Sequence, residues 1–295
     1  MSVNLQYVAS SGNVYNLKAE GIRSRDANYH EWDWVANGTQ LQFGQRISNF
    51  KRDPIAYDTT LLFYGSQQYR KAMIEALHED FELDVRNMSP GRVIWGDYYI
   101  DCYVSASSTE PDENLLWTDN KITFFCPYPF WIREEKKTFM PQEEIVGQEY
   151  LDYPYDYAYD YYYQPGFQEW IRDFPFATEF RMIIYGACAD PQVTINGHMY
   201  KVYDTLAATD YIVIDSRNHT VMKYLGNGQK VNIFDNRNKA QSVFKQIPPG
   251  RLVANWSGAF GFDLILFEER SEPRWDDNRY GDLTGNDADL QVERW

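Results

Sequence analysis

Apolar and polar residues alternate with period 2 along much of this 295-residue chain, in short runs separated by glycine, proline and asparagine. This alternation is typical of β-strands that bury one face. It predicts strands at residues 14–17, 92–95, 97–105, 121–126, 180–185, 193–195, 199–203, 211–215, 221–225, 231–234, 251–256 and 262–268. The pattern therefore favours a mainly β fold.

One segment departs from this period and has helical spacing. Tyr69, Met73, Leu77 and Phe81 follow one another four residues apart, as on one face of a helix. Ser66 precedes them, and a serine hydroxyl is a good N-cap. The spacing predicts a single α-helix over residues 67–81.

Two Asn-Gly pairs predict turns, because this dipeptide adopts the left-handed backbone conformation that tight hairpins need. Asn37-Gly38 follows the alternating run Trp32–Val35 and is expected to break it. Asn196-Gly197 separates two short strand patterns and predicts a β-hairpin.

The length and the change of pattern along the chain predict two domains. Residues 1–132 are expected to form a β domain with the one helix, and residues 179–270 a second β domain of the sandwich type. Residues 133–178 are expected to be a linker with a Tyr/Asp-rich insertion or arm, in which eight tyrosines lie between Tyr150 and Tyr163. Residues 271–295 are polar and acidic and form the expected C-terminal tail.

The formal net charge of −15 argues against a protein that grips nucleic acid, since phosphate binding requires clustered lysine and arginine. The first residues show no signal peptide pattern, and no apolar run is long enough to span a bilayer. The three cysteines, Cys102, Cys126 and Cys188, lack metal-site spacing and are expected to be free thiols. These features predict a protein made in a reducing cytoplasm.

The sequence predicts no catalytic, cofactor-binding or metal-binding residue. The four histidines are scattered and have no metal-site spacing, and nucleophile-elbow and phosphate-loop motifs are missing from the sequence. Aspartates between Asp276 and Asp289 resemble a calcium loop only loosely, because the glycine and the closing glutamate do not fit. With 43 acidic residues, some pair of carboxylates is always available, so a glycosidase is not specifically indicated.

The order of these features resembles the distal tail proteins of siphophages that infect Gram-positive bacteria. The resemblance lies in Tyr15-Asn16-Leu17, in Lys51–Pro54 before an apolar strand and the helix, and in Ile122–Trp131 at the end of the first domain. In the second half it lies in Ile195-Asn196-Gly197, Ile212–Asp215 and Pro248-Pro249-Gly250 with Trp256. The Tyr/Asp-rich segment and the acidic C-terminus have no counterpart in shorter members.

The resemblance implies a β-barrel-like N-terminal domain that forms a hexameric ring and a galectin-like C-terminal β-sandwich. It also implies a location at the tail tip of the virion and DNA passage through the lumen. The implied partners are other copies of the chain, the tail tube protein, the tail-associated lysin or fibre, and receptor-binding proteins.

The candidate interface residues are aromatic or basic residues in segments with too little periodicity for a core: Trp32, Trp34, Lys51, Arg52, Tyr153, Tyr155, Tyr157 and Tyr159. Two other functions stay open. The C-terminal sandwich could recognise cell-wall sugars through an aromatic platform such as Trp256 or Tyr211. An enzyme acting on the cell wall is the third alternative.

Overall fold

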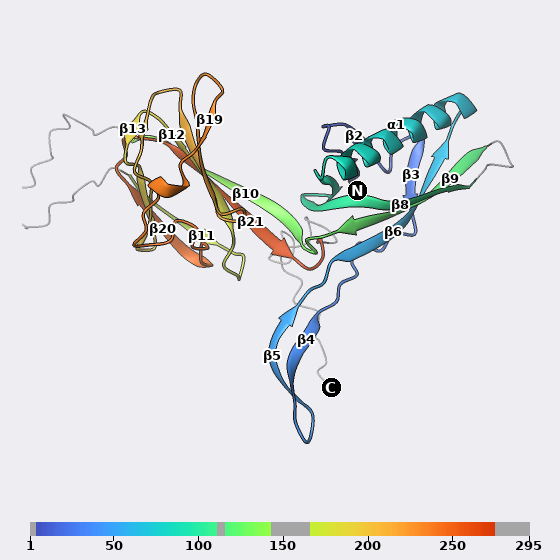
Figure 1. Cartoon of the computed structure of the whole chain (residues 1–295), viewed down its shortest axis with the longest axis horizontal. Helices are drawn as coiled ribbons and strands as arrows, with labels where there is room; N and C mark the ends of the chain where they lie inside the picture. Colours follow the sequence, from blue (N-terminus) through green and yellow to red (C-terminus); the bar gives the residue numbers. More distant parts are fainter. Residues whose placement is uncertain (1–3, 111–115, 143–165, 275–295) are drawn as a thin grey trace, which may run out of the picture. The chain divides into compact units, whose positions relative to one another are not determined.

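The computed structural model describes residues 4–110, 116–142 and 166–274. The chain divides into two units, residues 1–133 with 269–295 and residues 134–268. Strands dominate both, so the prediction of a mainly β fold is confirmed (Figure 1). In these described ranges there is one α-helix, and no helix is long and apolar enough to cross a bilayer.

Two antiparallel ladders of the first unit share one long strand, β8 (Tyr98–Glu110). Its first half lies in the order β8-β7-β1-β2, and its second half continues the order β8-β9-β6-β3. The register shifts between Val104 and Ala106, where β8 leaves one ladder for the other. The other strands are β1 (Leu5–Val8), β2 (Val14–Asn16), β3 (Ile22–Arg25), β6 (Ile55–Tyr64), β7 (Gly91–Trp95) and β9 (Trp117–Cys126).

Alternation along these strands places one side-chain set in a common core. The buried residues include Tyr7, Leu61, Val93, Ile100 and Phe124, one or more from each long strand. β10 (Trp131–Phe139) begins with the buried Trp131, and its Ile132 lies opposite Tyr99 of β8. Cys102 and Cys126 are buried free thiols, and burial raises the pKa of Cys102 well above its usual range.

The predicted helix is present as α1 (Gln67–Arg86) and covers the core with Leu77 and Phe81. Ser66 is the N-cap, and its Oγ accepts a hydrogen bond of 3.3 Å from the backbone N–H of Tyr69. The helix continues five residues beyond the predicted end. Residues 82–86 contain no helix breaker, and the helix stops only before Met88, which has φ of 51°, and Pro90.

The second unit contains two packed sheets. One has the order β19-β18-β17-β12-β21, with β10 beside β21, and the other has the order β11-β20-β14-β15. The strands are β11 (Phe167–Arg172), β12 (Phe180–Tyr185), β14 (Gln192–Ile195), β15 (His198–Lys201), β17 (Tyr211–Asp215), β18 (Thr220–Tyr224), β19 (Lys230–Asn232), β20 (Gly250–Trp256) and β21 (Phe262–Arg270). β13 (Cys188–Ala189) pairs with β16 (Thr205–Leu206), and η1 (Phe234–Asn236) is a short 3-10 helix.

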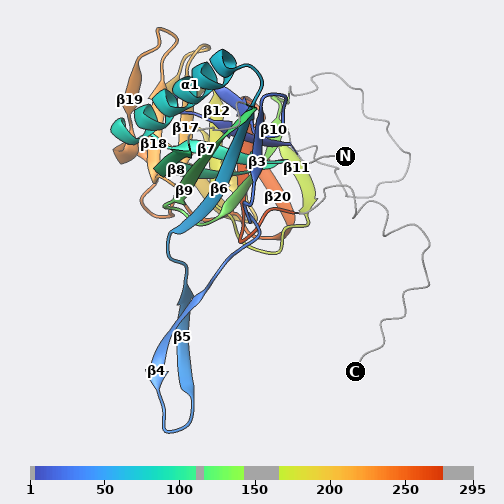
Figure 2. The same cartoon turned by 90° about the vertical axis from the view of Figure 1, so that its right-hand side faces the viewer.

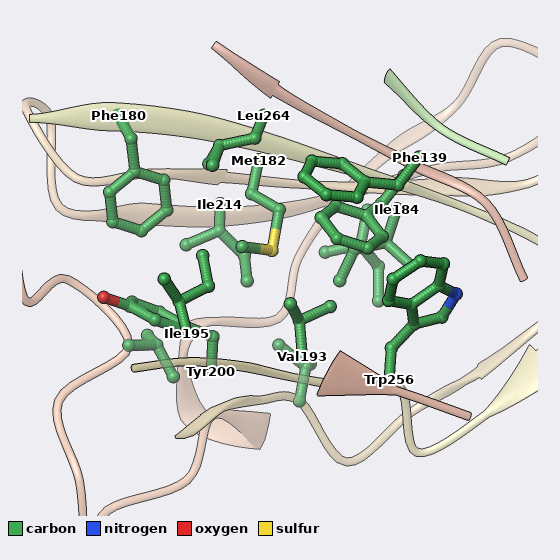
Figure 3. Close-up of a cluster of buried hydrophobic side chains, with 14 of the residues drawn as sticks. Phe139, Phe180, Met182, Ile184, Val193, Ile195, Tyr200, Ile214, Trp256 and Leu264 are labelled. Carbon is green, nitrogen blue, oxygen red and sulfur yellow. The ribbon is translucent and has the colours of Figure 1, made fainter. Parts of the chain in front are cut away.

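Apolar side chains from both sheets fill one core (Figure 3). Met182 and Ile214 come from one sheet, and Val193 and Ile195 come from the other. Phe139 stacks on Phe262 with ring centroids 4.3 Å apart. The described residues of the second unit therefore form a β-sandwich.

Local turn and strand predictions in this unit have mixed outcomes. The Asn196-Gly197 hairpin is confirmed, since Ile195 pairs with His198 and both turn residues have positive φ. Residues 133–178 are not all linker, because 134–139 lie in β10 and 167–172 form β11. The Tyr/Asp-rich segment from Tyr150 to Tyr163 and the aspartates beyond Asp276 lie outside the described residues.

Candidate assembly surface

A two-stranded hairpin of the first unit extends away from the strands around β6 (Figures 1 and 2). It consists of β4 (Val35–Gln40) and β5 (Gln45–Lys51), which pair with each other and with no other strand in the described part of the chain. Every residue of both strands except Asn37 is exposed. The hairpin thus contributes nothing to the core of its own unit.

The predicted break at Asn37-Gly38 is wrong, because both residues lie within β4. The register shifts there, and Ser48 is the extra residue on β5. A Cβ on Gly38 would approach the carbonyl oxygen of Arg46 to 2.2 Å, so this position requires glycine. The chain reverses instead at residues 41–44, where Gly44 has φ of 78°.

Large apolar side chains are exposed along the hairpin. Phe43 at the tip is 86% exposed and Phe50 is 57% exposed. Val35, Leu41 and Ile47 are also exposed. A concentration of apolar side chains on a projecting element is typical of an interaction surface, since single exposed apolar residues are common but clustered ones are not.

The charge of this region is opposite to that of the whole chain. Residues 34–52 contain Arg46, Lys51 and Arg52 and no acidic residue, whereas the chain has a net charge of −15. A surface that is apolar and locally basic fits an acidic partner.

At the base of the hairpin, Arg52 lies between two aromatic rings. Its Cζ is 4.8 Å from the ring centroid of Phe130 and 5.6 Å from that of Trp34. The two rings contact each other edge to face with centroids 6.0 Å apart. Burial lowers the pKa of Arg52, while the charges of Tyr57 and Asp33 act in the opposite direction.

The candidate interface residues from the sequence divide into three groups. The structure brings Trp34 and Arg52 together, whereas Trp32 is exposed just before the hairpin and Lys51 forms an exposed ion pair with Asp53. Tyr153, Tyr155, Tyr157 and Tyr159 lie outside the described residues. Phe130 is not among the residues that the sequence predicts, although its place after Pro127 and Pro129 marks a segment that leaves the sheet.

A second surface lies along α1. A groove of about 400 Å³ separates the helix from the bend in β8 and is lined by His78, Phe81, Glu82, Val85, Val104 and Ser107, among others. His78 lies within 3.1 Å of Ser107 Oγ and 3.2 Å of Asn120 Nδ2. These contacts give this histidine a structural role in closing the helix onto the sheet.

The second unit carries a larger cavity of about 600 Å³ beside β14 and β20. Gln192, Thr194, Asn255, Ser257 and Asp190 contribute amide, hydroxyl and carboxylate groups to its lining. Of the two aromatic platforms expected for sugar binding, Trp256 does not present its ring to solvent. Trp256 is buried and donates its indole N–H to the Phe260 carbonyl, and Tyr211 is stacked on Tyr224.

Among the residues that the structure describes, no three or more histidine, cysteine, aspartate or glutamate side chains lie close enough to hold a metal ion. Several perturbed pKa values belong to buried groups such as Tyr57, whose pKa burial raises to about 12. Tyr57 accepts a hydrogen bond from the Trp131 indole, at the floor of the first core.

No protein-family model matches the sequence, and no curated protein matches it. Solved structures do share its fold. A chain of the phage p2 baseplate, in its activated conformation with calcium, aligns with a TM-score of 0.63 and 14% identity, covering 92% of this chain and 100% of that chain. The p2 baseplate with strontium gives the same values.

The SPP1 Dit (gp 19.1) protein, described as a paradigm of the hub adsorption apparatus in phages that infect Gram-positive bacteria, aligns with a TM-score of 0.59. Its identity is 9%, and the alignment covers 92% of this chain and 100% of that chain. The likeness includes both units, because it extends along nearly the whole chain. This chain has the Dit-like fold of phage tail hub proteins.

Proposed function

We propose that this chain is a distal tail protein, a non-enzymatic structural hub at the tail tip of a siphophage. The observation that carries the proposal is the alignment with the SPP1 Dit hub protein over 92% of this chain. The exposed, apolar hairpin supports it, because clustered apolar side chains on a projecting element are typical of a surface that binds another protein.

The hub forms by closure of identical subunits into a ring, with six copies as the resemblance implies. A ring needs two different surfaces on each subunit, one that reaches and one that receives. The β4–β5 hairpin, with Trp32, Trp34, Lys51 and Arg52 at its base, is the reaching surface. The groove between α1 and β8 is available as a receiving surface, since it combines apolar Phe81 and Val85 with Glu82.

The ring joins the tail tube protein to the tail-associated lysin or fibre and carries receptor-binding proteins, and DNA passes through its lumen. The net charge of −15 suits that passage, because a lumen that bound phosphates would retain the DNA. The assembled protein is accordingly expected not to bind duplex DNA at physiological salt. A gel-shift titration that shows tight binding would contradict this part of the proposal.

The first experiment is light scattering after size exclusion of the full-length protein, with negative-stain images of the same peak. We expect a species about six times the protomer mass, seen as a ring with a central hole. The same sample mixed with the cognate tail tube protein tests the junction. A protein that stays monomeric at all concentrations, alone and with tail tube protein, would overturn the proposal of a ring hub.

A second candidate function is sugar binding by the second unit. Thr194 and Asn255 are cross-strand neighbours on the cavity wall, and Phe167, which pairs with Asn255, is 48% exposed beside them. An aromatic ring next to amides and hydroxyls is the arrangement that neutral sugars require. A glycan screen tests it with the wild type and Asn255→Ala. Binding that the variant loses would support this role, and no binding to any glycan would remove it.

A further inference from the structure

Two of the three guanidinium nitrogens of Arg52 are buried without a partner. Nε and Nη1 are shielded from water and form no hydrogen bond. Phe130 and Trp34 cover the group, with their ring centroids 4.8 and 5.6 Å from Cζ. Nη2, the third nitrogen, is not among the buried, unpaired atoms.

Burial of unpaired guanidinium nitrogens lowers the stability of an isolated chain. A buried donor without an acceptor loses its hydrogen bonds to water, and the loss is larger for a charged group than for a neutral one. The two aromatic rings offset part of this cost through cation–π attraction. Asp33 and Tyr57 are close enough to influence the charge, but neither accepts a hydrogen bond from Nε or Nη1.

Trp34, Phe130 and Arg52 also have the composition of an interface hot spot. Tryptophan, tyrosine and arginine dominate the residues that contribute most to binding energy, and they do so where water is excluded. Here Nε and Nη1 of Arg52 are already shielded from water, and two aromatic rings lie beside the group.

We propose that a carboxylate of a second copy of this chain binds the guanidinium of Arg52 beside the rings of Trp34 and Phe130. The inference deepens the proposed function and depends on it, because the second copy is the neighbour in the ring. The occupant is a carboxylate because planar guanidinium and carboxylate groups form strong charge-assisted hydrogen bonds.

The second copy is the favoured source of that carboxylate for reasons of charge. Each copy has 43 acidic and 28 basic residues, whereas residues 34–52 contain three basic residues and no acidic one. A nucleic-acid phosphate is the competing anion, but the net charge of −15 repels it. A carboxylate from the same copy is the other competitor.

The first test identifies the partner of residue 52 by carbodiimide cross-linking, which joins an amine only to a carboxylate in contact with it. The full-length variant Lys51→Arg, Arg52→Lys carries one amine at this site and none beside it. Rings assembled from equal amounts of ¹⁴N- and ¹⁵N-labelled protein separate the two sources. We expect peptides that join residue 52 of one isotope to an aspartate or glutamate of the other.

The outcomes of the cross-linking experiment are decisive in both directions. Mixed-isotope pairs at residue 52 support the proposal. Pairs of one isotope only would place the carboxylate in the same copy and overturn it. Intact rings with no cross-link from residue 52 would also overturn it, as would a wild type that stays monomeric both alone and with tail tube protein.

The second test measures ring assembly against protein concentration for the wild type, Arg52→Gln and the control Lys239→Gln. Both variants remove one positive charge, but Lys239 is exposed in the second unit, far along the chain from the hairpin. We expect Arg52→Gln to raise the midpoint concentration at least about tenfold, and Lys239→Gln to leave it within about twofold.

These results separate the failure of this inference from the failure of the proposed function. Rings with an unchanged midpoint in a folded Arg52→Gln protein would overturn the role of Arg52 and leave the hub intact. Duplex DNA binding that Arg52→Gln abolishes without affecting the rings would assign the site to phosphate instead. A wild type that stays monomeric both alone and with tail tube protein would contradict both proposals.

Discussion

Two carboxylates on the buried side of α1 hold the loop between β1 and β2. Asp84 is fully buried and accepts hydrogen bonds from the Tyr7 hydroxyl and from the backbone N–H and hydroxyl of Ser10. Asp80, one turn earlier, accepts hydrogen bonds from Ser11, Asn13 and Tyr15. The sequence shows these aspartates only as helix residues beside the apolar stripe, because their partners are more than 60 residues away.

The Asp80 contacts predict a dependence of stability on pH. Burial raises the pKa of this carboxyl, but the hydrogen bonds from Tyr15, Asn13 and Ser11 outweigh burial and hold the pKa below its usual value. Its stabilising effect is therefore complete above the unfolded pKa of about 3.9 and is lost as the pH falls through the lower folded pKa.

We expect the free energy of unfolding to fall more steeply with acidification in the wild type than in Asp80→Asn, whose side chain does not titrate. Urea denaturation between about pH 6 and about pH 3 measures the difference. Asp97→Asn, a change at an exposed turn residue, is the control and should follow the wild type. Parallel curves for the wild type and Asp80→Asn would contradict the prediction.

At the scale of elements, the β4–β5 hairpin shows how a local signal can be overridden. Asn37-Gly38 has the composition of a tight turn, but the strands continue past it through a bulge. Glycine is needed there for the close approach of the Arg46 carbonyl and not for chain reversal. A bulge and a turn both favour glycine, so composition alone does not separate them.

The hairpin can be removed with little expected effect on folding, because its two strands are exposed. Ala36 pairs with Phe50, so replacing residues 37–49 by Asn-Gly closes a two-residue turn and keeps Trp34 and Arg52. We expect the melting temperature to change by no more than about 2 °C, since no core contact is lost, and ring assembly to disappear.

Calorimetry and light scattering of the shortened protein check these two expectations separately. A large drop in melting temperature would show that the hairpin stabilises its own subunit. Rings with as many shortened subunits as the wild-type ring has subunits would show that the hairpin is not the reaching surface. The control is Thr39→Ser, a conservative change on the same hairpin that should alter neither property.

At the scale of the whole molecule, the chain has two separate apolar cores, one in each unit. Leu61 belongs to the first and Leu264 to the second, and both are fully buried. Replacing either leucine by alanine leaves a cavity and is expected to cost about 3 kcal/mol in its own unit.

Hydrogen exchange measured by mass spectrometry locates that cost. Leu61→Ala should raise exchange in β6 and β9 while β12 and β17 keep wild-type protection, and Leu264→Ala should do the reverse. Because the two substitutions are chemically identical, each serves as the control of the other. An equal rise in both units after either substitution would mean that the cores unfold as one cooperative body.

The sequence by itself determined the features that depend on local periodicity and local backbone preference. These include the mainly β composition, the capped helix after Ser66, the Asn196-Gly197 hairpin and most strands of the sandwich. Each is decided within a few residues, by which side chains alternate or recur and by which residues tolerate positive φ. The resemblance to distal tail proteins followed from the order of those same features.

Tertiary structure alone decided which distant residues meet. Strand β11 lies in the expected linker 133–178, and pairing with β20 makes it a strand. Its Ile171 is apolar but exposed, so alternation of apolar and polar residues does not mark this strand. Phe130 closes over Arg52 across 78 residues of sequence, and Asp84 meets Tyr7 across a similar distance. Such contacts depend on burial and hydrogen bonding between separate elements, which no local pattern encodes.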